Sequence, residues 1–464
     1  MKKFARTALI IYLLTWIGMF LWLEITLLLR GVSFSESIQF FGKLLSYTTF
    51  YIFLHVAFGL LLGLFFLARY FVRIYRAQGF GFFLKRLSLL VLLPLFVLVG
   101  GYKSVVHLNT QEDFKFAWDP SVENNTGVSN DHFKNDGKHR GMSVFGWWGD
   151  TNNDIGDLVK TNVEWVAVIP FLDQKDEQTN VVYTRDSFHQ WSRRDSIFIN
   201  TITKLHKKGI HVQLKPHLWL QSGWRSNINF ETDEDWETWF ESYSVNMLHY
   251  AKMAQETGAE LFCVGTELKT SITKQPEKWN QLISEIKAIY TGKLTYAANW
   301  DGDYDAISFW DQMDYIGIQA YFPLTNSKNP DLESIKKGWD AHINLLKDLS
   351  EKHLKPILFT EVGYKSEASS TIKPWEWENG LGVLYREKSD RTQVLAYEAL
   401  FQKLWNEDWF AGLYIWQWNT QSKPERALKS LDFSPRFKPA ENIIAKWFGK
   451  GHSSDFQIDF IPLE

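Results

Sequence analysis

Eight short apolar runs, separated by amphipathic segments, constrain the fold of this 464-residue chain more than any other feature. Each run has the length and near-continuous apolar character of a strand that is buried on both faces of a parallel sheet. The segments between them carry apolar residues at helical spacing, as at Leu282, Ile286 and Tyr290. This alternation predicts repeated strand and helix units around a parallel sheet. The expected strands are Gly141–Phe145, Trp165–Pro170, His211–His217, Leu261–Glu267, Leu294–Asn299, Tyr315–Tyr321, Ile357–Glu361 and Gly412–Trp418.

The strand count and a region of about 300 residues predict a closed (β/α)8 TIM barrel of the α/β class. An open, doubly wound sheet is the alternative, but no glycine-rich phosphate loop follows the first strand. We expect the barrel to span residues 140–449, followed by a C-terminal tail at 450–464. Two long connections, Leu172–Ser196 and Tyr364–Arg391, are expected walls of the cleft because the loops after barrel strands form the binding face.

Three apolar blocks precede the barrel, at residues 7–29, 44–70 and 87–102. A spanning helix needs about 20 apolar residues, so the first two blocks are long enough and the third, which contains Pro94, is marginal. A cleaved signal peptide is the alternative for the first block, but that block is too long and lacks a small-residue cleavage site. We expect residues 1–107 to form an α-helical transmembrane region of about three helices in the lipid bilayer, and residues 108–139 to form a polar linker.

The positions of lysine and arginine predict the orientation of these helices. Cytoplasmic connections are enriched in both residues. The N-terminus and the second connection are rich in lysine and arginine, whereas the first connection has only Arg30 and Lys43. The N-terminus and the second connection should therefore be cytoplasmic. Three crossings then place the barrel outside the cytoplasm, in a bacterial periplasm or at the cell exterior. If the third block does not cross, the barrel is cytoplasmic. The basic residues are Lys2, Lys3, Arg6, Arg69, Arg73, Arg76, Lys85 and Arg86.

Charge and cysteine content narrow the functional classes. The net charge of −3 argues against a polyanionic or polycationic partner, and the sequence has no nucleic-acid-binding motif, so we expect no nucleic acid as a partner. The chain has a single cysteine, Cys263, so an intrachain disulfide is excluded. Cys263 lies in an expected buried strand. His217 has no second histidine or carboxylate at ligand spacing, so we expect neither a metal nor another cofactor.

Two of the expected strands end on a carboxylate, Glu267 and Glu361. The C-terminal ends of barrel strands form the floor of the active site, and a pair of carboxyl groups is typical of glycoside hydrolysis. A single glutamate of this kind would more readily be explained as a helix cap or a partner of a surface lysine. The pair favours a glycosidase that acts on an oligo- or polysaccharide.

Counting along each strand in steps of two gives the side chains that face inward. Lys215 and His217 can hydrogen-bond sugar hydroxyls, and the indole of Trp416 can form a platform for a pyranose ring, with core packing as its alternative. Trp148 and Trp219 are further candidates for substrate contacts. The expected inward sets are Gln213, Lys215 and His217; Cys263, Gly265 and Glu267; Gln319 and Tyr321; and Tyr414, Trp416 and Trp418.

Several segments of the chain resemble glycoside hydrolase family 113. The resemblance covers roughly Arg140 to Gly449 and leaves out the membrane region. It implies an eight-stranded barrel, a retaining mechanism and endo-β-1,4-mannanase activity. The segments are Gly265-Thr-Glu267, Trp300-Asp-Gly-Asp-Tyr304, Phe309-Trp-Asp-Gln-Met-Asp-Tyr-Ile-Gly-Ile-Gln-Ala-Tyr-Phe-Pro-Leu324, Phe359-Thr-Glu-Val-Gly-Tyr364 and Phe433-Ser-Pro-Arg-Phe-Lys-Pro-Ala440.

The resemblance also implies roles for particular residues. Glu267 would be the acid/base, Glu361 the nucleophile and Tyr321 a neighbour of the nucleophile. Many members of the wider clan have asparagine before the acid/base, where it contacts the sugar 2-hydroxyl, but this chain has Thr266. Asn299, at the end of the next strand, is a candidate to replace that contact.

A non-catalytic module that binds glycans or assists envelope assembly on the same barrel is the alternative function, because a fold alone does not fix activity. Both acids, Glu267 and Glu361, are present, and this favours a membrane-anchored enzyme that hydrolyses β-linked glycans.

Overall fold

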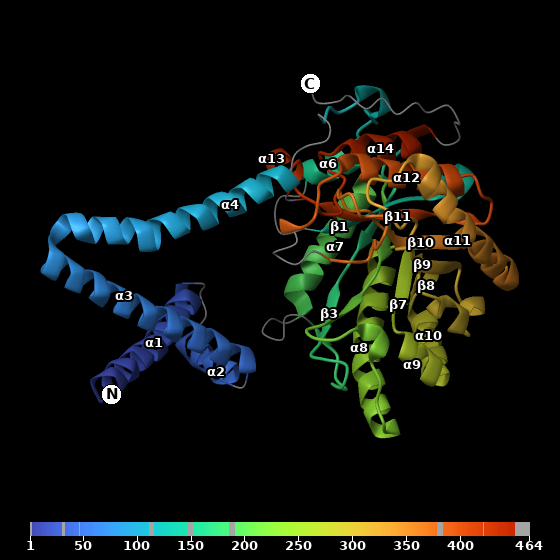
Figure 1. The fold of residues 1–464 in the computed structure, drawn as a ribbon. Helices are drawn as coiled ribbons and strands as arrows, with labels where there is room; N and C mark the ends of the chain where they lie inside the picture. Colours follow the sequence, from blue (N-terminus) through green and yellow to red (C-terminus); the bar gives the residue numbers. More distant parts are fainter. Residues whose placement is uncertain are drawn as a thin grey trace. The chain divides into compact units, whose positions relative to one another are not determined.

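The computed structural model describes residues 2–29, 33–45, 47–110, 116–145, 152–184, 191–377, 384–420 and 422–450. The chain divides into two compact units, Met1–Ser104 and Val105–Glu464, and each is described by itself. Figure 1 shows the second unit as strands surrounded by helices.

A closed barrel of eight strands forms the centre of the second unit, and every neighbouring pair in it is parallel. Each of the eight expected strands supplies one barrel strand, so the prediction of a TIM barrel is confirmed. The barrel strands are β1 (His139–Phe145), β2 (Trp165–Val168), β5 (His211–Leu214), β7 (Leu261–Thr266), β8 (Lys293–Asn299), β9 (Tyr315–Gln319), β10 (Ile357–Val362) and β11 (Phe410–Asn419).

Amphipathic helices cover the outside of the barrel. The longest of those described, α8, begins after Thr232, whose hydroxyl accepts the Asp235 N–H at 3.1 Å, and it ends at Gly258, which has a φ of 72°. Its buried face carries Trp236 and Trp239 against the strands. The helices of at least nine residues are α6 (Asn152–Lys160), α7 (Trp191–Lys207), α8 (Asp233–Thr257), α10 (Pro276–Ile289), α11 (Leu332–His353), α12 (Asp390–Leu404) and α14 (Pro439–Lys450).

A small three-stranded sheet was not expected from the sequence. Its strands are β3 (Phe171–Gln174), β4 (Tyr183–Thr184) and β6 (His217–Leu220). β4, and all of β3 except its first residue Phe171, lie within the connection Leu172–Ser196, which we expected to be a long loop. The expected strand His211–His217 is divided between β5 and β6, because Pro216 has no N–H with which to continue the ladder. β6 therefore brings His217 into the loops above the barrel.

The segment expected as a polar linker, residues 108–139, packs against the barrel over its described part. The carboxylate of Glu164 accepts the backbone N–H groups of His132 and Phe133 at 2.6 and 2.9 Å. Val122 is buried, and its carbonyl accepts the side chain of Asn162 at 2.8 Å. The segment was expected to be a linker because its composition is polar, but it is attached through these hydrogen bonds and through Phe133, whose ring packs against Trp165. It contains η2 (Pro120–Val122) and α5 (Phe133–Asp136).

The first unit is helical, and α4 continues a few residues beyond it. Among the described residues, two stretches have the length and composition to cross a membrane, Phe4–Leu29 and the 62-residue Thr48–Asn109. The second is interrupted at Gly79, where φ is 78°, and the ribbon turns sharply within α3 (Figure 1). The expected count of three spans is not confirmed. The helices are α1 (Lys2–Leu29), α2 (Phe34–Leu44), α3 (Thr48–Leu87), a π-helical turn η1 (Ser88–Leu92) and α4 (Leu93–Asn109).

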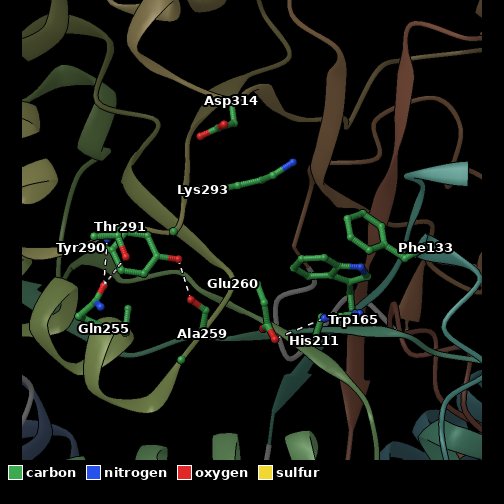
Figure 2. Close-up of a pocket in the computed structure, with 13 residues that line it drawn as sticks. Phe133, Trp165, His211, Gln255, Ala259, Glu260, Tyr290, Thr291, Lys293 and Asp314 are labelled. Atoms are coloured by element: carbon green, nitrogen blue, oxygen red, sulfur yellow. Dashed lines mark hydrogen bonds and ion pairs between the residues drawn. The ribbon is translucent and has the colours of Figure 1, made fainter. Parts of the chain in front are cut away.

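The N-terminal end of the barrel holds a pocket of about 510 Å³, lined by residues at or before the starts of the strands (Figure 2). Glu260 lies 3.3 Å from both His206 and His211, and it accepts the Val212 N–H at 2.7 Å. The hydroxyl of Tyr290 donates to the Ala259 carbonyl at 2.7 Å. These polar groups are paired with one another, so we interpret the N-terminal end of the barrel as one that stabilises the packing of the strands.

Candidate active site

Glu267 directly follows β7, at the C-terminal end of the barrel. Its φ of 53° lies in the left-handed region, which is uncommon for a residue with a Cβ and recurs at active sites. Hydrogen bonds hold this backbone in place: the Glu267 N–H donates to the Ala297 carbonyl at 2.9 Å, and the Ser226 hydroxyl donates to the Glu267 carbonyl at 2.7 Å. The side chain is only 3% exposed but lines the cleft above the barrel.

The inward set expected for β7 needs a correction at Gly265. The pairing of β7 with β8 shifts between Cys263 and Thr266, so the alternation of side chains is broken there. A Cβ on Gly265 would lie 2.7 Å from the ring of Trp279 on α10, so this position faces the helices and has no room for a side chain. Glu267 reaches the cleft through its left-handed backbone rather than through strict alternation.

Glu361 lies in β10, and its carboxylate is held by three side chains. Lys215 donates to Oε1 at 2.7 Å and Tyr321 donates to Oε2 at 3.0 Å. Nε2 of His217 lies 3.1 Å from Oε1. The amide oxygen of Gln319 accepts a further hydrogen bond from Lys215 at 3.1 Å. The residues that we expected to converge on the second acid are therefore brought together around it.

The surroundings of the two acids move their pKa values in opposite directions. Burial alone would raise the pKa of Glu361, but the charge of Lys215 and the hydrogen bond with His217 outweigh burial and lower this pKa to about 2. Burial raises the pKa of Glu267, against the charge of Arg225 and with support from the charge of Glu361. The cleft thus combines a carboxylate that stays ionised with a carboxyl group that retains its proton more readily. Groups separated in this way suit acid and base chemistry.

Two neighbours of Glu361 are electrically neutral near neutral pH. Burial, followed by the charge of Lys215, lowers the pKa of His217 to about 4. Burial, followed by the charge of Glu361, raises the pKa of Tyr321 well above its usual value. The phenol of Tyr321 therefore remains a hydrogen-bond donor to the carboxylate.

The cleft around both acids has a volume of about 500 Å³ and is rich in aromatic side chains. Trp300 and Trp375 stack with their ring centres 4.6 Å apart. Indole faces can stack on apolar faces of sugar rings while polar groups fix orientation. The residues that line the cleft are Phe145, Phe171, His217, Trp219, Trp224, Arg225, Glu267, Asn299, Trp300, Asp301, Gln319, Tyr321, Glu361, Trp375, Trp377, Trp416, Gln417 and Phe433.

Most of the remaining candidate residues also line this cleft. Trp219, on β6, is 46% exposed, and Asn299 ends β8. Trp416 packs nearly parallel to His217, with an angle of 9° between the rings. Lys215 is fully buried beneath the cleft, so it serves Glu361 rather than an exposed sugar subsite. Trp148 lies outside the described residues.

Trp418 does not share the face of Trp416, contrary to expectation. The pairing of β1 with β11 shifts by one residue, so that Ser143 pairs with Trp416 and Val144 pairs with Trp418. Trp418 is consequently buried in the outer core, beneath the guanidinium of Arg436. Strand periodicity alone cannot reveal such a shift.

Sequence reasoning missed Arg225 and the aromatic residues of the loops. Arg225 lies in a short turn, η3 (Arg225–Asn227), after β6, and it contacts Glu267. Trp375 and Trp377 belong to the long connection after β10. We expected this connection to form a wall of the cleft but predicted none of its residues as a substrate contact. The alternation rule applies only within strands, so it could not find loop residues. Among the described residues, no three His, Cys, Asp or Glu side chains are arranged to hold a metal ion.

Comparison with known proteins agrees with this geometry. The model of glycoside hydrolase family 113 matches residues 142–436, which is more than half of the chain. No curated protein gives a significant match.

The solved structures that are similar to the barrel include two of family 113. One is a complex of a family 113 β-1,4-mannanase, which is 26% identical with a TM-score of 0.59, over 68% of this chain and 99% of that chain. The other is the family 113 β-mannanase of Alicyclobacillus acidocaldarius in complex with ManMIm, which is 28% identical with a TM-score of 0.59, over 67% of this chain and 97% of that chain. This chain is therefore a glycoside hydrolase and belongs to glycoside hydrolase family 113.

Proposed function

We propose that the protein is a membrane-anchored endo-β-1,4-mannanase that works by retaining double displacement. The observation that carries the mechanism is the pair Glu267 and Glu361, which line one cleft and have oppositely shifted pKa values. The β-mannanase activity of the two similar structures supports the choice of substrate.

In the first half of the proposed reaction, the carboxylate of Glu361 attacks the anomeric carbon while the bond to the glycosidic oxygen breaks. Glu267 gives its proton to that oxygen, so the leaving sugar departs as an alcohol. Lys215 and Tyr321 hold the attacking carboxylate in place through the hydrogen bonds described above. The product of this step is an ester between the sugar and Glu361.

In the second half, Glu267 is ionised and takes a proton from water, and the water oxygen attacks the anomeric carbon and releases Glu361. Two inversions leave the product with the β configuration of the substrate. Trp416, Trp219 and Asn299 are proposed to contact the sugar, because all three line the cleft. Asn299 is the candidate partner for the 2-hydroxyl.

We further propose that the N-terminal helices anchor the protein in a membrane and that the barrel lies outside the cytoplasm. Support comes from the large apolar side chains that α1 and α4 leave exposed, such as Trp22 at 69% and Leu98 at 70%. The 62-residue helical stretch is roughly three times as long as one span needs. Basic residues on both sides of the break at Gly79 fit two spans that meet on the cytoplasmic side.

The proposed function is tested by incubating the full chain, in detergent, with β-1,4-mannan, β-1,4-glucan and aryl β-glycosides. We expect hydrolysis of mannan, with the β anomer formed first in proton NMR spectra. Formation of the α anomer first would reject the retaining mechanism. Binding of mannan without hydrolysis of any substrate would favour a glycan-binding module.

A further inference from the structure

Arg225 binds the carboxyl group of Glu267 through two donors that meet at one oxygen. Its Nε and Nη2 donate to Oε2 at 3.0 and 2.5 Å. Its Nη1 donates to the Leu218 carbonyl at 3.2 Å, and its guanidinium lies 4.7 Å from the ring centre of Trp224. The arginine side chain is 13% exposed, so solvent screens this ion pair only weakly. The turn after β6 therefore fixes Arg225 against a single oxygen of Glu267.

This arrangement makes the two oxygens of Glu267 inequivalent. A carboxylate oxygen has two lone-pair sites, and two N–H donors occupy both of them on Oε2. A guanidinium remains protonated in proteins and cannot accept a proton. A proton on Glu267 is consequently directed to Oε1.

We propose that Arg225 is a positioning residue for the acid/base Glu267, which fixes the transferable proton on Oε1 and stabilises the carboxylate as that proton leaves. This inference rests on the proposed role of Glu267. In the first half-reaction the proton passes from Oε1 to the glycosidic oxygen, and Arg225 compensates the new charge on the carboxylate. In the second half-reaction Oε1 takes a proton from water while Arg225 keeps Oε2 occupied.

Each acid of the cleft then has its own cation. Lys215 holds Glu361 at 2.7 Å, and Arg225 holds Glu267. Removal of Lys215 and removal of Arg225 should therefore affect two different steps of catalysis. Lys215 acts on nucleophilic attack, which every substrate needs, whereas Arg225 acts on proton transfer, which only a poor leaving group needs.

The test compares Arg225→Met with wild type on two substrates, a β-1,4-mannooligosaccharide and a 2,4-dinitrophenyl β-mannoside. The full chain in detergent is used throughout. We expect kcat/KM for the oligosaccharide to fall about 10²-fold and kcat/KM for the aryl glycoside to fall less than about threefold, because the aryl group leaves without protonation. The ratio of the two values does not depend on the fraction of folded enzyme, so partial loss of folding leaves the test intact.

The pH profile of kcat/KM gives a second readout. Without the charge of Arg225 the pKa of Glu267 rises, so the basic limb should move up by about one pH unit. Arg225→Lys keeps the charge but loses the paired donors. Its basic limb should therefore lie close to that of wild type, whereas its kcat/KM on the oligosaccharide should stay well below the wild-type value.

Two control variants separate this role from a structural one. Lys215→Met should lower activity on both substrates equally and move the acidic limb upward, because the pKa of Glu361 rises. Arg426→Met removes an exposed arginine on α13 (Pro424–Ala427) and should leave kcat/KM on both substrates unchanged.

Equal losses on both substrates in Arg225→Met, with an unmoved basic limb, would overturn the inference and leave the proposed function standing. A wild type that cleaves neither substrate would instead reject the proposed function, and the inference with it. If Arg225→Met yields no folded protein, the same substrate ratio in Arg225→Lys decides: an unchanged ratio overturns the inference.

Discussion

Glu267 and Glu361 are the same functional group in two different electrostatic surroundings. Glu361 is held by Lys215, Tyr321 and His217, whereas Glu267 is buried against the guanidinium of Arg225 and hydrogen-bonded to Gln319. Burial raises the pKa of both carboxyl groups. At Glu361 the charge of Lys215 and the hydrogen bond with His217 outweigh burial, whereas at Glu267 the charge of Arg225 does not. The roles of acid/base and nucleophile should therefore be separable by removing one carboxyl group at a time.

We predict that azide rescues the two glutamate variants with opposite stereochemistry. In Glu267→Ala the nucleophile remains, so an aryl β-mannoside still glycosylates Glu361, and azide then gives the β-glycosyl azide. In Glu361→Gly azide enters from the vacated face and gives the α azide. Proton NMR of the products reads both configurations. An α azide from the Glu267 variant would reverse the proposed assignment.

The strand-end rule found residues at or near the ends of the expected barrel strands. Glu361 and Tyr321 were predicted from the sequence because parallel strands end at the same edge of the barrel. His217 was predicted by the same rule, although the structure places it on β6 of the small sheet. Arg225 and Trp375 could not be predicted in this way, because loop positions depend on packing that has no period in the sequence.

At the scale of elements, β11 carries two tryptophans with different surroundings. Trp416 lines the cleft, whereas Trp418 is fully buried in the outer core. Two-residue periodicity predicted the same face for both, and the register shift between β1 and β11 is the physical reason that they differ. The pair thus offers a matched comparison within a single strand.

We predict that Trp416→Ala lowers kcat/KM on mannooligosaccharides by about fivefold, since a stacked aromatic ring contributes about 1 kcal/mol beyond its buried area. Trp418→Ala should instead lower the free energy of unfolding by about 3–5 kcal/mol through the cavity that it leaves. Kinetics and thermal unfolding of both variants, compared with wild type, make the distinction. A larger loss of stability in Trp416→Ala than in Trp418→Ala, with normal turnover, would make Trp416 a core residue.

The cluster at the N-terminal end of the barrel should make stability depend on pH (Figure 2). Burial would raise the pKa of Glu260, but hydrogen bonds with His206 and His211 lower it to about 2. Burial would lower the pKa of His211, but hydrogen bonds with Glu260 and Asp131 raise it. Glu260 stabilises the fold above its usual pKa of 4.5, and this is lost as pH falls towards 2. His211 stabilises the fold below its usual pKa of 6.5, and this is lost as pH rises through its raised pKa.

We therefore predict that Glu260→Gln costs most stability between about pH 4.5 and 6.5, where both groups are charged in the folded state. The loss should be smaller at about pH 9, where histidine is neutral. Urea unfolding of wild type and variant at about pH 5.5 and pH 9, followed by tryptophan fluorescence, measures the difference. The same loss at both pH values would show that hydrogen bonding or packing, rather than charge, is responsible.

At the scale of the whole molecule, the barrel was predictable because eight apolar runs repeat with regular helices between them. The number of membrane spans was harder to predict, because apolar composition does not mark where one helix ends and the next begins. In the structure Gly79 interrupts α3 within the basic segment, eight residues before the start of the expected third block. The interruption depends on the backbone of one glycine, and hydropathy does not record it.

We predict three crossings, with the break at Gly79 on the cytoplasmic side and the barrel outside. Alkaline phosphatase folds only outside the cytoplasm, so a fusion after Tyr102 should be active. A fusion after Arg86 should be inactive, because the charges of Arg73, Arg76 and Arg86 keep this connection inside. A fusion after Gly42, in the first connection, should be active and serves as the matched control. A silent fusion after Tyr102, together with a cytoplasmic fluorescent protein that folds at the same position, would leave only two crossings and place the glycosidase inside the cell.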